Sequence, residues 1–358
     1  MKKLEYTVGF ATPAFLGNAE QQAQWRTPPF KALIRQWWRV VHSARGIVDV
    51  DRMRRVEGEL FGAAADGDST RSRVRIRLKE WSPGAVTQWG ADDRVQHPEV
   101  HNRDGRQMPV GAQLYLGYGP LGFRQGATAL NTDPVRSAIA ETQPNALTLM
   151  FPDEDALTLQ SVMQLIAWFG TLGSRSRNAW GSLQLAGPDL APLSRTDLES
   201  MSVCRPLEDC LKHDWPHAIG ADAIGPLVWK TKPASSWREV MKELARIKIA
   251  FRTQQTLTLE GVQKGQFGNR HFLAYPVTNH SVDGKAWAGQ GRLGNQLRFK
   301  LLREEAGLAG VMVHLPARLP EEMVRDLPRD VQQNLADRQL RTWRAVHDVL
   351  NAEAIRIA

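Results

Sequence analysis

Two stretches near the start of the chain decide the class of fold. The first is Leu4-Glu5-Tyr6-Thr7-Val8-Gly9-Phe10, in which apolar and other side chains alternate. The second is Pro28-Pro29-Phe30-Lys31-Ala32-Leu33-Ile34-Arg35-Gln36-Trp37-Trp38-Arg39-Val40-Val41. A period of two predicts a half-buried strand. In the second stretch the apolar residues recur as on one helix face, and proline suits the first helical turn. The chain therefore begins with a strand followed by an amphipathic helix.

Outward from this pair, further elements follow in an order that is typical of one fold. A short helix is predicted over residues 50–61 and an alternating strand over 73–79. After a long excursion at 82–111 we expect a strand at 146–151, an apolar helix at 156–169 and a strand at 182–186. The order strand, helix, strand, strand, helix, strand is the split βαβ, or ferredoxin-like, pattern.

A similar order recurs in the second half of the chain. A short strand is predicted at 227–230, and Ser236 with Glu239 has the spacing of a helix capping box. Strands around 271–277, 296–302 and 310–315 follow, and helical sequence over 321–354 closes the chain. We therefore predict an α+β protein with two tandem ferredoxin-like domains that carry insertions. The domains are expected at 1–190 and 226–358, with a connector at 191–225.

The composition is that of a globular protein with one basic segment. A length of 358 residues suits about two domains. Lys and Arg number 46 against 38 Asp and Glu, a formal net charge of +8. Residues 23–79 contain 13 Lys or Arg and 6 Asp or Glu, so most of the excess charge lies there. Such a local positive field favours polyanionic partners, although a solvated basic surface has the same composition.

Other features of the composition exclude several classes of protein. No run of 18 uncharged apolar residues is present, which argues against a transmembrane helix. Glu5 interrupts the apolar sequence that a signal peptide would need. Cys204 and Cys210 are too few for a disulfide framework or a Cys-rich zinc site. We therefore expect a cytoplasmic, reduced protein without a cofactor or metal.

Two rows of cations have the chemistry of contacts to a nucleic acid. On the first helix, Lys31, Arg35 and Arg39 recur every four residues and form a basic stripe beside the apolar face. The strand at 73–79 carries cations at alternate positions, namely Arg73, Arg75, Arg77 and Lys79. A solvent-facing strand that pairs with acids explains this second row equally well. The helical spacing of Trp37 and Trp38 favours core packing over base stacking.

The third candidate is the loop Gly170-Thr171-Leu172-Gly173-Ser174-Arg175-Ser176-Arg177-Asn178-Ala179-Trp180-Gly181. Glycines allow the main chain to approach a ligand closely, and successive N–H groups can hold a phosphate. The loop lacks the Gly-Lys-Ser/Thr of a Walker motif and the G-x-G-x-x-G of a dinucleotide site. The candidate contacts in it are Gly173, Ser174, Arg175, Arg177 and Asn178.

Two of these stretches resemble one known family. Its N-terminal signature is similar to Thr12-Pro13-Ala14-Phe15-Leu16-Gly17 together with Arg26-Thr27-Pro28-Pro29-Phe30-Lys31-Ala32-Leu33-Ile34-Arg35-Gln36-Trp37-Trp38-Arg39. The family is the first-numbered RAMP subunit of the Cmr complex, the type III-B CRISPR effector. The stretch Leu172–Leu183 resembles the Gly-rich loop of the RAMP superfamily.

The resemblance implies two RRM-like domains in a subunit at the end of the effector that holds the 3′ part of the guide RNA. The subunit would help to admit target RNA, and its partners would be guide (CRISPR) RNA, single-stranded target RNA and other Cmr subunits. The implied RNA contacts are Lys31, Arg35, Arg39, Ser174, Arg175 and Arg177. No catalytic residue is implied, because target cleavage is assigned to a different RAMP subunit. The excursion at 82–111 would be the projecting thumb of RAMP folds.

Two other functions remain open. A stand-alone RAMP endoribonuclease could use Asp92 and Asp93 as metal ligands, or a general base among His271, His280 and His314. No H-E-x-x-H or C-x-x-C supports this chemistry. Lys264, Arg270 and His271 lie close in sequence, which favours an RNA contact instead. A protein-assembly module would use its basic surface to meet acidic subunits and would bind little RNA at any salt concentration.

Overall fold

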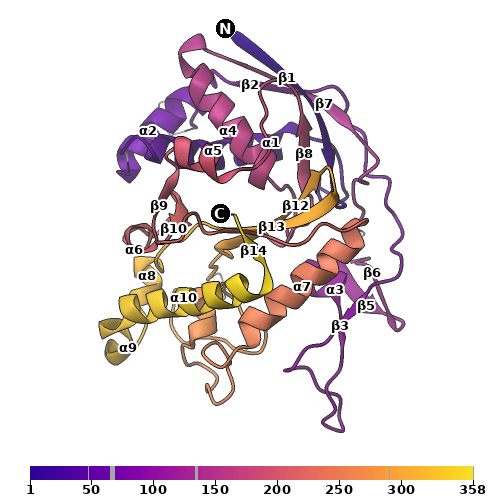
Figure 1. Ribbon diagram of the computed structural model, residues 1–358, viewed down its shortest axis with the longest axis vertical. Helices are drawn as coiled ribbons and strands as arrows, with labels where there is room; N and C mark the ends of the chain where they lie inside the picture. The colour runs from indigo at the N-terminus through magenta and orange to yellow at the C-terminus, as the bar shows by residue number, and fades with distance from the viewer. Residues whose placement is uncertain (47, 65–68, 134–135, 290, 358) are drawn as a thin grey trace.

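The chain forms two four-stranded antiparallel sheets with helices packed on them (Figure 1). The computed structural model describes residues 1–46, 48–64, 69–133, 136–289 and 291–357. Within these residues no helix is both long enough and apolar enough to cross a lipid bilayer. The mixed α+β architecture agrees with the sequence prediction.

The first sheet has the strand order β2-β7-β1-β8, and every neighbouring pair is antiparallel. We call this sheet and its helices the first unit. Its elements are β1 (Lys2–Phe10), α1 (Thr27–Ser43), α2 (Val50–Phe61), β2 (Arg75–Leu78), β7 (Asn145–Phe151), η1 (Asp153–Asp155), α4 (Ala156–Phe169) and β8 (Leu183–Ala186). In chain order the strands alternate with α1 and α4 as in the split βαβ pattern, so this part of the prediction is confirmed.

Helices cover one face of the first sheet only (Figure 1). Leu4, Tyr6 and Val8 alternate on the covered face of β1 and are buried in the same core as Trp37 and Trp38 of α1. The prediction that these two tryptophans belong to the core is thus confirmed. The opposite face of β1 stays exposed.

A long insertion separates β2 from β7. It contains β3 (Arg94–Val95), β4 (Val110–Gly111), α3 (Ala112–Gly117), β5 (Leu121–Arg124) and β6 (Ala127–Leu130). The excursion at 82–111 includes a short antiparallel ribbon of β3 and β4, whose connecting loop projects from the molecule beside α7 (Figure 1). The insertion runs beyond residue 111, because β5 and β6 form a further hairpin.

The second sheet has the strand order β12-β13-β11-β14 and is also antiparallel throughout. We call this sheet and its helices the second unit. Its elements are β11 (Val228–Lys230), α7 (Trp237–Thr253), η2 (Asn269–Phe272), β12 (Leu297–Glu304), β13 (Gly307–His314), α8 (Glu321–Arg325), α9 (Arg329–Gln333), α10 (Leu335–Glu353) and β14 (Ile355–Arg356). The residues between the two units form α5 (Arg195–Ser200), β9 (Cys204–Pro206), α6 (Leu207–Cys210) and β10 (Ile219–Ala221).

One local prediction in the second unit is wrong. The strand expected around 271–277 is replaced by η2, because the Gly268 N–H donates to Nδ1 of His271 (2.9 Å) and closes a turn there. The helical sequence expected over 321–354 is confirmed, and it is divided into three helices, with Pro328 between the first two. A two-residue strand, β14, follows them and pairs with β11.

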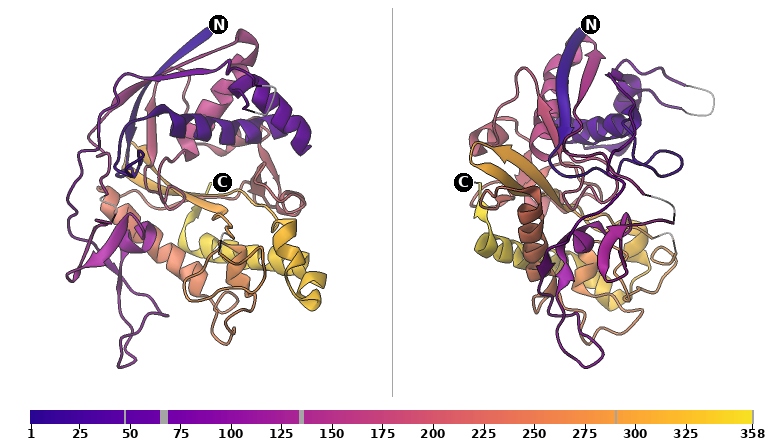
Figure 2. Two further views of the ribbon diagram at one scale, coloured as in Figure 1. Left: turned by 180° about the vertical axis from the view of Figure 1, so that it is seen from behind. Right: turned by 90° about the vertical axis from the view of Figure 1, so that its right-hand side faces the viewer.

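The second sheet is buried on both faces. Trp229 and Met312 belong to the core that includes α7 and α10, whereas Val228, Val311 and Val313 belong to the core of the first unit. In the view from behind, the second sheet lies between the helices of the two units (Figure 2). The first sheet therefore has one face that is open to solvent, whereas both faces of the second sheet are covered.

Candidate nucleic-acid interface

The Gly-rich loop, residues 170–181, leads from α4 to β8 and has a fixed shape. Gly173 has a φ of 95°, and a Cβ there would lie 2.6 Å from the carbonyl oxygen of Phe15. Ser174 donates its backbone N–H to the same oxygen at 2.9 Å. Glycine is needed at 173 because a side chain would meet both an unfavourable φ and the main chain. The loop is thus held against residue 15.

The same loop joins the two units. Phe299 of β12 donates its N–H to the carbonyl oxygen of Arg177 at 3.0 Å. Asn178 donates through Nδ2 to the carbonyl oxygen of Leu116 in α3 (2.9 Å) and accepts from Nζ of Lys248 in α7 (2.7 Å). The predicted loop residues therefore lie where the first unit, the insertion and the second unit meet.

Five cations gather around this loop, and we call them the loop cluster. They are Arg175, Arg177, Lys248, Arg298 and Lys300, contributed by the loop, α7 and β12. Arg175 and Arg177 are exposed, whereas the other three are buried. Among the residues that the structure describes, none of the five is paired with a carboxylate. The cluster therefore carries positive charge without a protein counter-ion.

Two of the buried cations, Lys300 and Arg298, contact helix carbonyl oxygens and an aromatic ring. Nζ of Lys300 donates to the carbonyl oxygens of Ile166 (3.0 Å) and Ala167 at the end of α4. The negative end of the helix dipole there favours a cation. The Arg298 guanidinium lies 5.9 Å from the ring centre of Trp37, and its Nε has no hydrogen-bond partner.

Burial and neighbouring cations lower the pKa values of two members of the cluster, Arg298 and Lys248. Burial, with a further contribution from Arg177, lowers the pKa of Arg298 to about 9. Burial also lowers the pKa of Lys248, and the nearby cations Arg252 and Arg175 add to that effect. Because these neighbours are cations, the site would be stabilised by a bound anion.

Two of the three cations in the basic stripe on α1 are paired with a carboxylate. Nε of Arg35 donates to Glu57 at 2.5 Å, and Arg39 makes two hydrogen bonds to the same carboxylate at 2.7 and 2.8 Å. Glu57 is a buried residue of α2; its burial raises the pKa, but the hydrogen bonds from Arg39 and Arg35 outweigh this and lower it. Lys31 is half-buried. The stripe therefore carries less net charge than its sequence indicates.

The second predicted row lies on β2, at the edge of the first sheet. Arg73 is ion-paired with Glu154. Arg75, Arg77 and Lys79 are exposed. These three residues alternate along the chain as predicted, and they line one hollow together with residues of β1 and β7.

The predicted contacts in the second unit lie apart from the loop cluster. Lys264 is exposed. Arg270 is buried and pairs with Glu99 of the excursion, which ties the β3–β4 loop to the second unit. His271 is fully buried, with its ring nitrogens next to Gly268 and the carbonyl oxygen of His280 (3.2 Å). We leave Arg270 and His271 out of the interface because neither reaches the surface.

The carboxylates considered for catalysis have structural partners. Asp92 accepts hydrogen bonds from the N–H groups of Gln113 and Leu114 and from the hydroxyl of Thr128, so it caps α3. Asp93 lies 3.9 Å from Lys242. In the described ranges, no three His, Cys, Asp or Glu side chains are arranged to hold a metal ion.

The histidines considered as a general base do not gather at one surface. His314 is fully buried, and its Nδ1 lies 3.0 Å from Nε2 of His347. His314 is the last residue of β13, and its ring centre lies 4.0 Å from that of Trp343 in the core of the second unit.

Sequence reasoning missed Lys248, Arg298 and Lys300. One signal for the last two was present, because they interrupt an otherwise apolar strand at alternate positions. Cations at buried strand positions are rare unless paired, so they indicate a special environment. Lys248 gave no such signal, because its helix is basic at several positions.

Comparison with known proteins gives a similarity in fold. No protein-family model and no curated protein matches the chain. A chain in a cryo-EM structure of the type III-B Cmr-beta complex, bound to cognate target RNA and AMPPnP in the presence of ssDNA, matches with a TM-score of 0.51 and 10% identity, over 98% of each chain. Cmr1 from Pyrococcus furiosus (apo form) aligns over 90% of each chain with 15% identity and a TM-score of 0.45. In a second Cmr-beta structure with target RNA, the match covers 97% of this chain and 100% of that one, with 10% identity and a TM-score of 0.45.

The first of these matches spans both units of the chain. The chain thus has, over nearly its whole length, the fold of a chain of the type III-B Cmr-beta complex.

Proposed function

We propose that this protein is a non-catalytic, RNA-binding subunit of a type III-B CRISPR (Cmr) effector. Its two units would be the tandem RAMP domains, at 1–190 and 226–358. It would occupy the end of the complex that holds the 3′ part of the guide RNA and would help to admit target RNA. The observation that carries the proposal is the loop cluster, five cations around a Gly-rich loop without a carboxylate partner in the described residues.

RNA is the anion that suits this cluster best. Arg175 and Arg177 are the two exposed residues of the cluster, and a guanidinium group pairs with two phosphate oxygens at once. Lys248 lies near Arg175 and Arg298 lies near Arg177, and these two buried cations strengthen the local positive potential through a medium of low polarity. Phosphate contacts of this kind give affinity with little sequence preference, as expected for a subunit whose specificity comes from a guide.

The test is a titration of the purified chain with labelled single-stranded and duplex RNA at low and moderate salt. We expect salt-sensitive binding to single strands without cleavage products. R175A/R177A should weaken binding at least about tenfold, since one charge-assisted hydrogen bond contributes roughly 1.5–3 kcal/mol. The control is R329A/R341A, which removes two exposed arginines of the second unit that have no ion pair in the described structure.

Other results would replace the proposal. Cleaved RNA would favour the endoribonuclease, and the lack of binding at both salt concentrations would favour the assembly module. The position in the complex is tested separately by assembling the effector on guide RNA with photoreactive nucleotides. We expect crosslinks to this chain from the 3′ part of the guide; crosslinks confined to the 5′ part would contradict the placement.

A further inference from the structure

The open face of the first sheet is chemically distinct from the covered face. Lys3 and Thr7 of β1, Ala146 of β7 and Arg75 and Arg77 of β2 are all exposed. Their neighbours along each strand are buried or half-buried. The second sheet offers no such surface, because it is buried on both faces. The open face is therefore a wide, solvent-accessible surface built on a rigid element.

Free cations line one side of this face. A hollow of about 560 Å³ is bordered by Arg75, Arg77 and Lys79 on the β2 side. The acid in its lining is Glu5, which pairs with Lys3 at 2.8 Å. The three cations on the β2 side have no ion pair in the described part of the chain, so their charge is available to a ligand.

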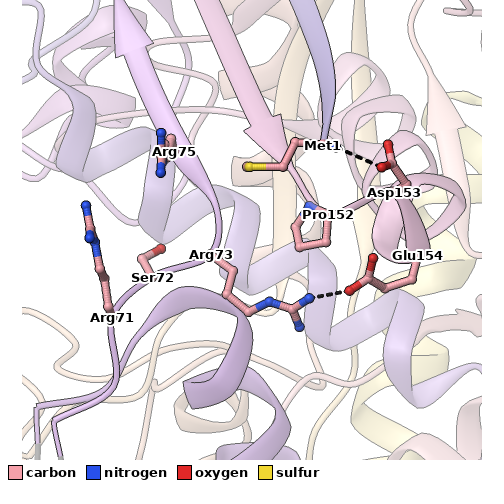
Figure 3. A pocket seen from close by; sticks show the side chains of 8 residues that line it. All are labelled: Met1, Arg71, Ser72, Arg73, Arg75, Pro152, Asp153 and Glu154. Atoms are coloured by element: carbon pink, nitrogen blue, oxygen red, sulfur yellow. Dashed lines mark hydrogen bonds and ion pairs between the residues drawn. The ribbon is translucent and has the colours of Figure 1, made fainter.

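A second hollow, of about 460 Å³, continues from the first at Arg75 (Figure 3). Its acids are engaged: Glu154 pairs with Arg73, and Asp153 lies 2.7 Å from the Met1 amino nitrogen. Figure 3 shows Arg71 and Arg75 on the other side of this hollow, pointing away from both acids. The basic border thus extends from residue 71 to residue 79.

An exposed tryptophan follows this border. The β2–β7 pairing continues past β2, with hydrogen bonds from Lys79 N to Ala146 O (2.9 Å) and from Glu80 N to Asn145 Oδ1 (3.2 Å). Trp81 comes next and is 54% exposed, the one tryptophan among the described residues that is mostly exposed. An exposed indole that follows a row of cations in the chain is suited to stack on a base.

We propose that the open face of the first sheet is a second binding track for single-stranded RNA, separate from the loop cluster. The phosphates would lie along Arg75, Arg77 and Lys79, and Trp81 would stack on a base. Alternate residues of a strand are about 6.6 Å apart, a spacing comparable with that of successive phosphates in an extended strand. The proposal does not depend on the loop cluster, since different residues carry it.

An acidic protein partner fits this face less well. The hollow is lined by cations, Glu5, Thr148 and three aliphatic or thioether side chains, those of Ile76, Ala146 and Met150. Protein interfaces derive most of their affinity from a centre rich in aromatic and other large side chains, and this lining contains no aromatic residue. A strand of RNA needs only a charged border and a stacking platform.

The experiment measures binding of a fluorescein-labelled 15-nucleotide oligouridylate to the full chain by anisotropy, over a series of salt concentrations. R75A/R77A should weaken binding at least fivefold and reduce the slope of log affinity against log salt by about 1.4, or 0.7 per lost contact. W81A should weaken binding by roughly fivefold or more with an unchanged slope, whereas W81F, which keeps an aromatic ring, should bind nearly as the parent does. The control is R329A/R341A, which removes the same charge elsewhere.

Two results would overturn the proposal. In the first, R75A/R77A and W81A bind the oligouridylate as tightly as the control does. In the second, they bind it normally but fail to enter the assembled ribonucleoprotein, which would make the face a site for a protein partner. R175A/R177A is measured in parallel, so that a failure of the loop cluster and a failure of the open face are seen separately. Because Trp81 is exposed, the W81A and W81F pair stays informative even if R75A/R77A aggregates at the strand edge.

Discussion

Lys248 Nζ lies 2.7 Å from Oδ1 of Asn178, so that a buried lysine of α7 is held by an amide of the Gly-rich loop. The two residues are 70 positions apart in the chain and belong to different units. A buried ammonium group costs free energy unless its hydrogen atoms find acceptors. The contact therefore couples the shape of the loop to the packing of the second unit.

Removing the amide should destabilise the protein. N178A takes the Oδ1 acceptor away from the buried Lys248, which should lower the free energy of unfolding by about 1–3 kcal/mol. In a double-mutant cycle, the N178A/K248M double variant should cost less than the sum of the two single changes. Urea unfolding measures each value. An N178A protein as stable as the parent would show that Lys248 does not depend on this contact.

Gly294 offers a way to move Arg177 without deleting it. A Cβ at residue 294 would lie 1.5 Å from a terminal guanidinium nitrogen of Arg177, so G294A must displace that flexible side chain. We expect weaker RNA binding with a free energy of unfolding within about 0.5 kcal/mol of the parent. The matched control is G122A, where a Cβ meets open space. Equal RNA affinity of the two variants would show that the position of Arg177 is unimportant.

A substitution at Glu57 can distinguish a structural role of Arg35 and Arg39 from a role in RNA binding. E57Q removes the charge that pairs with Arg35 and Arg39, which should cost about 2 kcal/mol, less than a fully buried ion pair because both arginines are partly exposed. If these arginines contact RNA, the same variant should bind RNA at least as tightly as the parent, since they gain freedom. Urea unfolding and anisotropy measure the two effects. If E57Q is fully folded under the conditions of the assay and still binds RNA more weakly than the parent, the predicted RNA contacts of Arg35 and Arg39 are contradicted.

The buried pair of His314 and His347 should make stability depend on pH. Burial, with help from Arg356, lowers the pKa of His347 to about 3, and burial with the neighbouring His347 lowers the pKa of His314. In the unfolded chain both titrate near 6.5. Below that pH the unfolded chain binds more protons than the folded chain, so stability is lost as the pH falls. From pH 7.5 to 5.5 the pair should cost about 2–3 kcal/mol, and other histidines with lowered pKa values add to it.

Urea unfolding at several pH values measures this dependence. The H347Q variant serves as the control, because glutamine keeps a hydrogen-bonding group but does not titrate in this range. We expect a smaller loss of stability for H347Q between pH 7.5 and 5.5. A parent protein with equal stability at both pH values would rule out the assigned pKa shifts.

Local pattern was a good guide to the helices and to strands such as β8 and β11, and a poor guide to strands of only two residues. The helices at 50–61 and 156–169 have the predicted bounds, because amphipathic spacing and capping residues act within a few turns. β14 has only two residues and exists because β11 offers an unpaired edge. No period can be read from two residues, so such a strand is visible only in the folded chain. The turn at η2 depends in the same way on one histidine ring.

Residue type and spacing were sufficient to predict the order of elements in the first sheet, the two tryptophans in the core, the Gly-rich loop and the resemblance that connects them. Whether each cation is buried, and whether it has a counter-ion, depends on the tertiary structure. Arg39 has a counter-ion in Glu57, Arg270 has one in Glu99, and Arg298 lies buried without one. The energy of a charge depends on its distance to other charges and on its exposure to water. Those distances join residues that are far apart in the chain, so folding alone determines which cations remain available to RNA.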